Sequence, residues 1–228
     1  MSDTLLSALV LIPALVFAIV FHEVSHGWTA LALGDTTARD MRRLSLNPIR
    51  HVDPIGTVIL PGALALFGAP IFGWAKPVPV NARRLRNPRY GMMAVAAAGP
   101  ASNLVLAAIA AVALGLVGRG LQAQPEGALA LAMMGLNYFI LINIFLALFN
   151  LLPIPPFDGS HIVEGLLPRD AARAYAKLRP LGLPLVFLLL LVLPSLFPGF
   201  DLMGRFLFPV VTRVQDFYYG IAAWAAGV

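Results

Sequence analysis

Long stretches without a charged side chain dominate this sequence of 228 residues. Residues 4–21, 90–118 and 127–157 contain no Asp, Glu, Lys or Arg. A helix of about 20 apolar residues is long enough to cross the hydrocarbon core of a bilayer. Only 12% of the residues are charged, against about 25% in ordinary soluble domains. The sequence therefore predicts a polytopic membrane protein and argues against a disordered chain or a nucleic-acid-binding domain.

The three uncharged stretches predict three long helices. The first helix is expected from about residue 5 to Leu33, with Gly34 as its C-cap. The second and third are expected within residues 90–118 and 127–157, which are rich in Ala, Leu and Val. Between Arg179 and Asp201 a fourth apolar stretch is broken by prolines, and residues 202–228 mix aromatic with charged side chains. We therefore expect an all-α fold with one or two C-terminal membrane helices, and residues 202–228 either cross the bilayer or lie at its surface.

Residues 54–75 are also uncharged but contain many Pro and Gly residues, which makes a straight helix unfavourable. The β-branched pieces Thr57–Ile59 and Val78–Val80 predict a re-entrant loop or a short β-hairpin that is covered by protein. Such a loop returns to the side of the membrane from which it started. The second and third helices then bring the chain back to the face that the first helix approaches.

The basic residues are unevenly distributed along the chain. Nine of the 16 Lys and Arg residues lie between Arg39 and Arg89, and four more lie between Arg169 and Arg179. Because cytoplasmic loops of membrane proteins are enriched in Lys and Arg, we expect both segments to be cytoplasmic, with the N-terminus outside. The net charge of +5 is thus attributed to membrane topology and not to nucleic-acid binding. The predicted location is the cell membrane, as a multi-pass protein.

The first helix contains the sequence His22-Glu23-Val24-Ser25-His26, an HExxH motif. Residues four apart lie on the same face of a helix, so both imidazoles can bind one Zn²⁺, and Glu23 can act as the general base. The chain has no cysteine, so its other metal ligands must be His, Asp or Glu. Ionisable residues within a membrane span are rare and mark functional sites. The alternative is a buried histidine pair bridged by Glu23.

Catalytic zinc sites have three protein ligands, so a third ligand is needed. Asp158 follows the third apolar stretch and, after two crossings, returns to the face that His26 approaches. In isolation Asp158 also fits a turn, because Pro-Phe-Asp-Gly is a favourable turn sequence. Two other pairs could supply the third ligand, and both lie among basic residues: His161 with Glu164, and His51 with Asp53.

An amide side chain, Asn103, lies early in the second apolar stretch, within Gly99-Pro-Ala-Ser-Asn103. Its side chain could donate a hydrogen bond to an oxyanion. It could equally satisfy its polar atoms within or between helices. The sequence leaves both interpretations open.

Three motifs together resemble the site-2 protease family of intramembrane zinc metalloproteases, peptidase family M50. They are HExxH at 22–26, GxxxN at 99–103 and NxxPxPxxDG at 150–159, in that order, and residues 73–81 resemble the family's loop between the first two core helices. The resemblance covers about residues 5–165. It implies a compact member without a PDZ or CBS domain. It also implies roles in the site: His22, His26 and Asp158 as zinc ligands, Glu23 as the base, and Asn103 and Asn150 as helpers in substrate or transition-state binding.

The sequence as a whole predicts a zinc endopeptidase that cleaves in or next to a transmembrane segment, on the cytoplasmic side. We expect one domain over residues 1–228, with a three-helix catalytic core at about 5–165, membrane segments at about 180–228, and one Zn²⁺ per chain. The partners are a membrane-protein substrate and the bilayer, and the oligomeric state is open. The backbone at Val78 and Val80 is expected to pair with an unwound substrate. The alternatives are a secondary transporter or metal-ion permease that uses the same residues, and a non-cleaving regulator.

Overall fold

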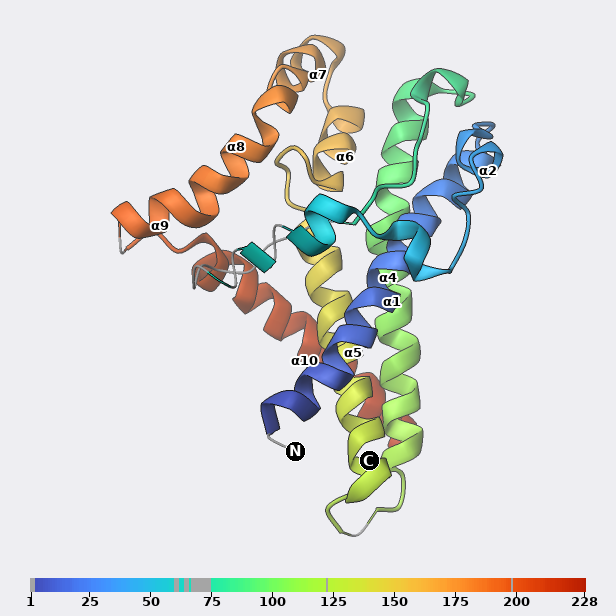
Figure 1. Cartoon of the computed structure of the whole chain (residues 1–228), viewed down its shortest axis with the longest axis vertical. Helices are drawn as coiled ribbons and strands as arrows, with labels where there is room; N and C mark the ends of the chain where they lie inside the picture. The colour runs from blue at the N-terminus through green and yellow to red at the C-terminus, as the bar shows by residue number, and fades with distance from the viewer. Residues whose placement is uncertain (1–2, 60–61, 64–65, 67–74, 122, 198) are drawn as a thin grey trace.

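The computed structural model describes residues 3–59, 62–63, 66, 75–121, 123–197 and 199–228 (Figure 1). Among these described residues the regular structure is helical and contains no strand. The long helices are α1 (Asp3–Ala32), α4 (Pro88–Gly118) and α5 (Gly127–Asn150). The shorter α-helices are α2 (Thr37–Asp40), α6 (Asp158–Leu166), α7 (Arg169–Ala176), α8 (Gly182–Phe187), α9 (Leu193–Leu196) and α10 (Phe208–Ala226). Short 3₁₀ segments cover Pro48–His51, Ala82–Arg84 and Arg179–Leu181, and π-helical segments cover Pro54–Ile59, Leu188–Val192 and Met203–Leu207.

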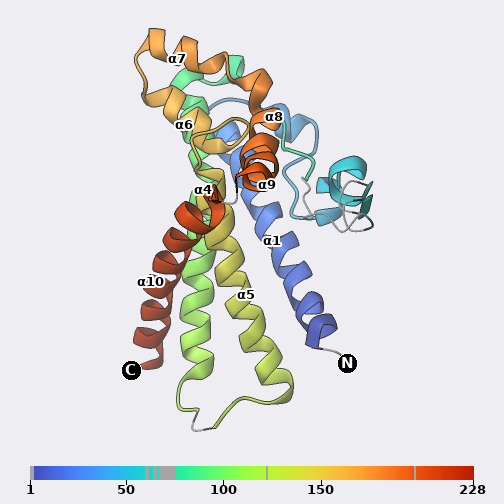
Figure 2. The same ribbon diagram turned by 90° about the vertical axis from the view of Figure 1, so that its left-hand side faces the viewer.

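The helices α1, α4 and α5 pack together, with α4 running opposite to the other two (Figure 2). Both termini and the link between α4 and α5 lie at one end, while α6 and α7 lie at the other (Figures 1 and 2). Each long helix is long and apolar enough to cross a membrane, and so is the helical stretch of residues 169–196. These four candidate spans confirm the predicted multi-pass helical architecture.

The ends of the long helices follow from local sequence. The side chain of Asn87 accepts a hydrogen bond from the backbone N–H of Tyr90 (3.2 Å) and caps the start of α4. Gly34 follows the end of α1 with φ of 107°, a left-handed conformation that glycine adopts readily, as expected for the predicted C-cap. The third helix ends at Asn150 and not near residue 157, because the prolines from Pro153 onward lack the N–H that a helix needs.

The segment of residues 54–75 differs in part from the prediction. Thr57–Ile59 lies within a π-helical segment, so the hairpin alternative, which needs a strand at these residues, is wrong. The carboxylate of Asp53 starts this turn, because its Oδ1 accepts hydrogen bonds from the next helical N–H groups. Val78–Val80 is irregular and is not paired with any strand among the described residues, and residues 60–61, 64–65 and 67–74 lie outside them. The two ends of the segment meet, since Lys76 N–H donates to the His51 carbonyl (2.8 Å), and adjacent ends are what a re-entrant segment requires.

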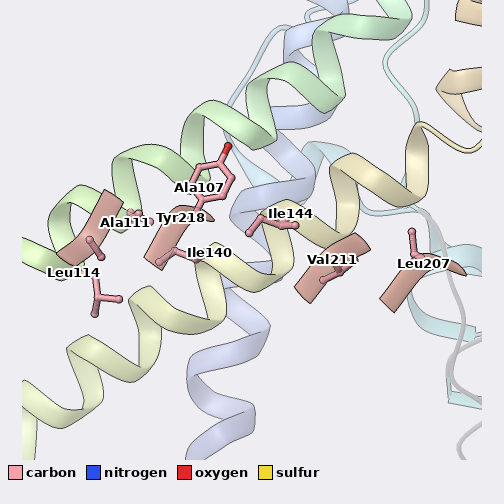
Figure 3. Close-up of a cluster of buried hydrophobic side chains, with 10 residues drawn as sticks. Ala107, Ala111, Leu114, Ile140, Ile144, Leu207, Val211 and Tyr218 are labelled. Atoms are coloured by element: carbon pink, nitrogen blue, oxygen red, sulfur yellow. The ribbon is translucent and has the colours of Figure 1, made fainter. Parts of the chain in front are cut away.

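The C-terminal helix α10 packs against α4 and α5 and completes the main apolar core. Figure 3 shows small residues of α4 and isoleucines of α5 facing α10. Gly115 is required for this close approach, because a Cβ there would lie 2.1 Å from the Ala222 carbonyl oxygen. In a bilayer, tight packing of this kind replaces hydrophobic collapse as the main attraction between helices. The core therefore holds α4 in place, and α4 in turn supports the polar site described next.

Candidate metal centre

Three predicted ligand side chains converge beside the C-terminal third of α1. His22 and His26 lie one turn apart on α1, and Asp158 lies at the first position of α6. The Oδ2 atom of Asp158 is 3.1 Å from Nε2 of His22 and 3.4 Å from Nε2 of His26. The three candidate ligand atoms all lie within 4.8 Å of one another. The spacing of the two histidines therefore gives the expected shared face, and the fold brings Asp158 to it.

The tautomers of both histidines follow from their other hydrogen bonds. Nδ1 of His26 is 2.7 Å from the Val95 carbonyl, which can only accept, so Nδ1 carries the hydrogen. Nδ1 of His22 is 2.6 Å from Oδ1 of Asn103. The side-chain nitrogen of Asn103 is identified by its donation to the Ala18 carbonyl (3.2 Å), so Nδ1 of His22 is also a donor. In the neutral rings both Nε2 atoms then present lone pairs to Asp158.

This donor set fits a divalent cation and Zn²⁺ in particular. Two imidazole nitrogens and one carboxylate oxygen are the ligands of a catalytic zinc site that keeps a position open. Without a cation, three acceptor atoms would face one another, and Oδ2 of Asp158 is buried without a hydrogen-bond partner. His22 is only 6% exposed and His26 only 9%, so water does not offset this repulsion well. A bound cation would remove the repulsion among these three acceptor atoms.

Gly99 of α4 leaves the space that the two imidazoles occupy. A Cβ at this position would lie 2.5 Å from Cε1 of His26 and 2.7 Å from Cε1 of His22. Any side chain would therefore displace the ligand rings. This contact explains physically why a glycine stands four residues before Asn103.

Asn103 is fully buried. Its contacts support a role in orienting His22 and not the oxyanion contact that the sequence left open. Its side-chain oxygen orients His22, while its nitrogen donates to the Ala18 carbonyl and to Oδ1 of Asn143 (2.8 Å). Asn143, on α5, is also fully buried, and its own nitrogen donates to the Phe139 carbonyl. The sequence reasoning missed Asn143, although a polar residue in the middle of an apolar stretch is a recognised signal. The amide pair thus fixes the ring of His22 from behind.

Glu23 lines a cavity of about 290 Å³ together with His22, His26 and Asp158. One of its carboxylate oxygens, Oε2, accepts a hydrogen bond from the backbone N–H of Val78 (2.9 Å). The other oxygen has no partner among the residues that the structure describes. Glu23 is therefore held in place on one oxygen and is available for proton transfer on the other.

The segment of residues 76–81, which forms neither helix nor strand, carries Val78 and is held by side chains from outside the HExxH motif. The guanidinium of Arg43 donates to the Lys76 carbonyl (2.9 Å), and the carboxylate of Asp35 accepts from the backbone N–H of Asn81 (2.6 Å). Gly27 gives the segment room, because a Cβ there would lie 2.8 Å from a methyl group of Val78. No periodic pattern of residue types predicts these contacts. Arg43 and Asp35 thus position the backbone group that holds Glu23.

We expect Asp35→Asn to weaken this support in a pH-dependent way. Burial would raise the pKa of Asp35, but hydrogen bonds from Thr37 and Asn81 outweigh it and lower the pKa below 3.8. The stabilisation is therefore complete above pH 3.8 and is lost as the pH falls through the lowered pKa. At neutral pH the variant should be less stable by about 1–3 kcal/mol.

The measurement is the thermal unfolding midpoint in detergent, recorded between pH 7 and pH 3. The difference between wild type and Asp35→Asn should shrink toward the acid end. Asp216→Asn, an exposed carboxylate on α10, serves as the control and should match wild type. A difference that stays constant across the whole range would contradict the assignment.

The remaining predicted site residues are placed as follows. Asn150 and Val80 line the same cavity as Glu23, and the side-chain nitrogen of Asn150 donates to the Leu146 carbonyl (2.9 Å). His161 also lines this cavity, and burial together with the charge of Arg179 lowers its pKa. The other alternative ligands have local partners: Glu164 pairs with Arg179, His51 bonds the Ser45 carbonyl, and Asp53 caps the following turn. Only His22, His26 and Asp158 form a ligand cluster among the described residues.

Comparisons with known proteins agree with this site. YwhC of Bacillus subtilis is 40% identical over 188 residues, which cover 81% of this chain and 80% of YwhC. Rip2 of Mycolicibacterium smegmatis is 30% identical over 201 residues, which cover 88% of this chain and 70% of Rip2. Both relatives are zinc metalloproteases by name, and no solved structure matches the chain. The sequence profile named Peptidase family M50 matches residues 10–193, a range that includes all three candidate ligands, and the chain therefore belongs to peptidase family M50.

Proposed function

We propose that the chain is an intramembrane zinc endopeptidase, which hydrolyses a peptide bond in or next to a transmembrane segment of a membrane protein. The observation that carries the proposal is the convergence of His22, His26 and Asp158 on one cavity with Glu23. This cavity lies among helices that are long and apolar enough to cross a membrane. Membership of a peptidase family and the names of the relatives support proteolysis as the reaction and zinc as the metal.

The residues of the site divide the chemistry between them. A bound Zn²⁺ supplies Lewis acidity, which polarises the scissile carbonyl and lowers the pKa of water to about 7. Glu23 takes a proton from the attacking water and later gives it to the leaving amine. Val78 holds the carboxylate of Glu23 through its N–H, and Asn103 holds the ring of His22. Proton transfer thus takes place at one carboxylate oxygen of Glu23.

The backbone of the 76–81 segment offers a place for an unwound substrate. The Val78 carbonyl and the Val80 N–H make no hydrogen bond with any residue that the structure describes. They can pair with an extended peptide by β-augmentation, whereas the Val78 N–H is occupied by Glu23. Asn150 lines the same cavity, and because its side-chain nitrogen donates to the Leu146 carbonyl, its side-chain oxygen can accept an N–H of the substrate. A substrate helix must unwind locally to use these groups.

The distribution of basic residues orients the proposed enzyme. Parts of both basic segments, namely α2, the start of α4 and α7, lie toward the end of the bundle that carries α6 (Figure 1). By the positive-inside rule this end is cytoplasmic, and the metal centre opens toward it. We include residues 1–228 in one functional domain, because α10 packs on the core helices.

The proposal is tested with purified protein and a panel of model transmembrane peptides in detergent, with the products identified by mass spectrometry. We expect cleavage in or beside the apolar segment, complete loss of cleavage after removal of the metal with a chelator, and recovery with about one Zn²⁺ per chain. If the zinc-loaded protein cleaves none of the peptides but transports metal ions into liposomes, the endopeptidase proposal is wrong and the permease alternative is correct.

A further inference from the structure

A second cavity, of about 640 Å³, lies next to the metal centre at the basic end of the bundle. It is lined by the start of α4 and by α6 and α7, and α6 lies next to both other helices (Figures 1 and 2). Four arginines line it, together with one carboxylate: Arg89, Arg169, Arg173, Arg179 and Glu164. We call it the arginine cavity. The proposed chemistry at the metal centre leaves these arginines without a role.

The arginine cavity is adjacent to the metal centre. His161 and Met92 line both cavities, so the two lie side by side. Arg89 lies ten residues before Gly99 on α4, which corresponds to about 15 Å along the helix axis. An extended peptide covers this distance with about four or five residues. The cavity is thus within reach of a polypeptide that occupies the metal centre.

The positive charge of the arginine cavity is only partly neutralised. Arg179 pairs with Glu164, and Arg173 pairs with Asp170. The guanidinium of Arg169 has neither a hydrogen bond nor an ion pair with any residue in the described part of the chain. Its guanidinium is therefore available to an anionic partner.

Arg89 is also without a carboxylate partner. Its guanidinium donates to the Leu167 carbonyl, which carries no net charge, and its Nε is buried without a hydrogen-bond partner among the described residues. A concave site with an excess of fixed positive charge attracts carboxylates and disfavours Lys and Arg.

We propose that the arginine cavity binds acidic side chains of the substrate. These side chains lie about four or five residues from the scissile bond, in the flank on the side of the membrane where the basic segments of this chain lie. This inference rests on the proposed endopeptidase function. A peptide is a better occupant than a lipid headgroup, because the cavity adjoins the site where the peptide is held and shares His161 and Met92 with it. Most membrane proteins carry Lys and Arg at their cytoplasmic flanks, so the cavity excludes the commonest flank. It selects substrates with an acidic flank.

The test measures peptide binding to the zinc-loaded Glu23→Gln variant by fluorescence anisotropy. Three labelled peptides share one apolar Leu/Ala segment and differ only in a flank of Glu, Gln or Lys. We expect the Glu peptide to bind about five- to tenfold more tightly than the Gln peptide at low ionic strength, and the Lys peptide to bind most weakly. The preference should decrease at 1 M salt, where the Debye length falls to about 3 Å.

The matched variants assign the preference to this cavity. R169Q/R173Q should reduce the difference between the Glu and Gln peptides to less than about twofold. Arg119→Gln removes an exposed arginine at the opposite end of α4 and should leave the preference unchanged. All variants are compared at equal zinc content, which shows that the metal centre is intact.

Three results would overturn the proposal. The first is equal binding of the three peptides by the Glu23→Gln protein without further substitutions. The second is a preference for the Glu peptide that survives in R169Q/R173Q. The third is that R169Q/R173Q loses binding to phosphatidylglycerol in nanodiscs while its binding to the peptides does not change. The last result would assign the arginines to lipid. Because binding is measured in a variant that cannot cleave, a failure of wild type to hydrolyse any peptide would count against the proposed function alone.

Discussion

Replacing Glu23 with glutamine should lower kcat for peptide hydrolysis by about 10³-fold or more while zinc stays bound. General acid–base catalysis contributes about 10²–10⁴-fold, and here one carboxylate serves in both proton transfers. Glutamine has the same shape, and its amide oxygen can still accept the hydrogen bond from the Val78 N–H (2.9 Å in the structure). The substitution therefore removes the base without moving the segment that holds it.

The measurement combines kcat on a model transmembrane peptide with the zinc content per chain. Glu126→Gln is the matched control, because Glu126 is an exposed carboxylate at the opposite end of the bundle and should behave like wild type. If Glu23→Gln keeps more than a tenth of the wild-type kcat, another group acts as the base.

Asp158→Ala should weaken zinc binding by more than about 100-fold, and hydrolysis should be lost with the metal. Loss of a group that only supports a ligand costs about 10–100-fold in metal affinity, and loss of a ligand should cost more. Oδ2 of Asp158 lies 3.1 Å and 3.4 Å from the two Nε2 atoms, and its removal leaves two ligands. A two-ligand site does not hold catalytic zinc.

Zinc affinity is measured by competition with a chelator of known affinity, and Asp216→Asn serves as the control. Gly99→Ala provides a companion variant, because its methyl group would lie 2.5 Å from the His26 ring and would disturb the ligands without removing one. Unchanged zinc affinity in Asp158→Ala would show that the third ligand is another residue.

The sequence predicted those parts of the site that depend on helix periodicity and on the number of crossings. The i, i+4 spacing of His22 and His26 is local, and it places both rings on one face. The position of Asp158 required only that two crossings separate it from α1, and the structure brings it within 3.1 Å of His22. The hairpin alternative at Thr57–Ile59 failed because β-propensity depends on context, and a capping carboxylate at Asp53 favoured a helical turn instead.

The contacts that sequence reasoning missed are long-range hydrogen bonds to backbone groups. The bond from Val78 N–H to Glu23 joins residues that are 55 positions apart, and the bond from Arg43 to the Lys76 carbonyl joins residues 33 apart. A backbone group has the same chemistry in every residue, so no pattern of residue types identifies which N–H or carbonyl is used. Asn143 was different, since its polar side chain in an apolar helix could have identified it.

The single backbone hydrogen bond between Lys76 N–H and the His51 carbonyl also has a consequence for how this enzyme core can diversify. It ties the two ends of residues 52–75 together at the point where the segment leaves and rejoins the bundle. Because lengthening a closed loop costs little extra entropy, insertions or replacements between these ends can be accommodated at small cost. Val78 and the neighbouring Lys76 carbonyl are bonded to Glu23 and Arg43, neither of which belongs to this segment. Substitutions between residues 52 and 75 can therefore change substrate preference without disturbing the metal ligands, which lie outside this segment.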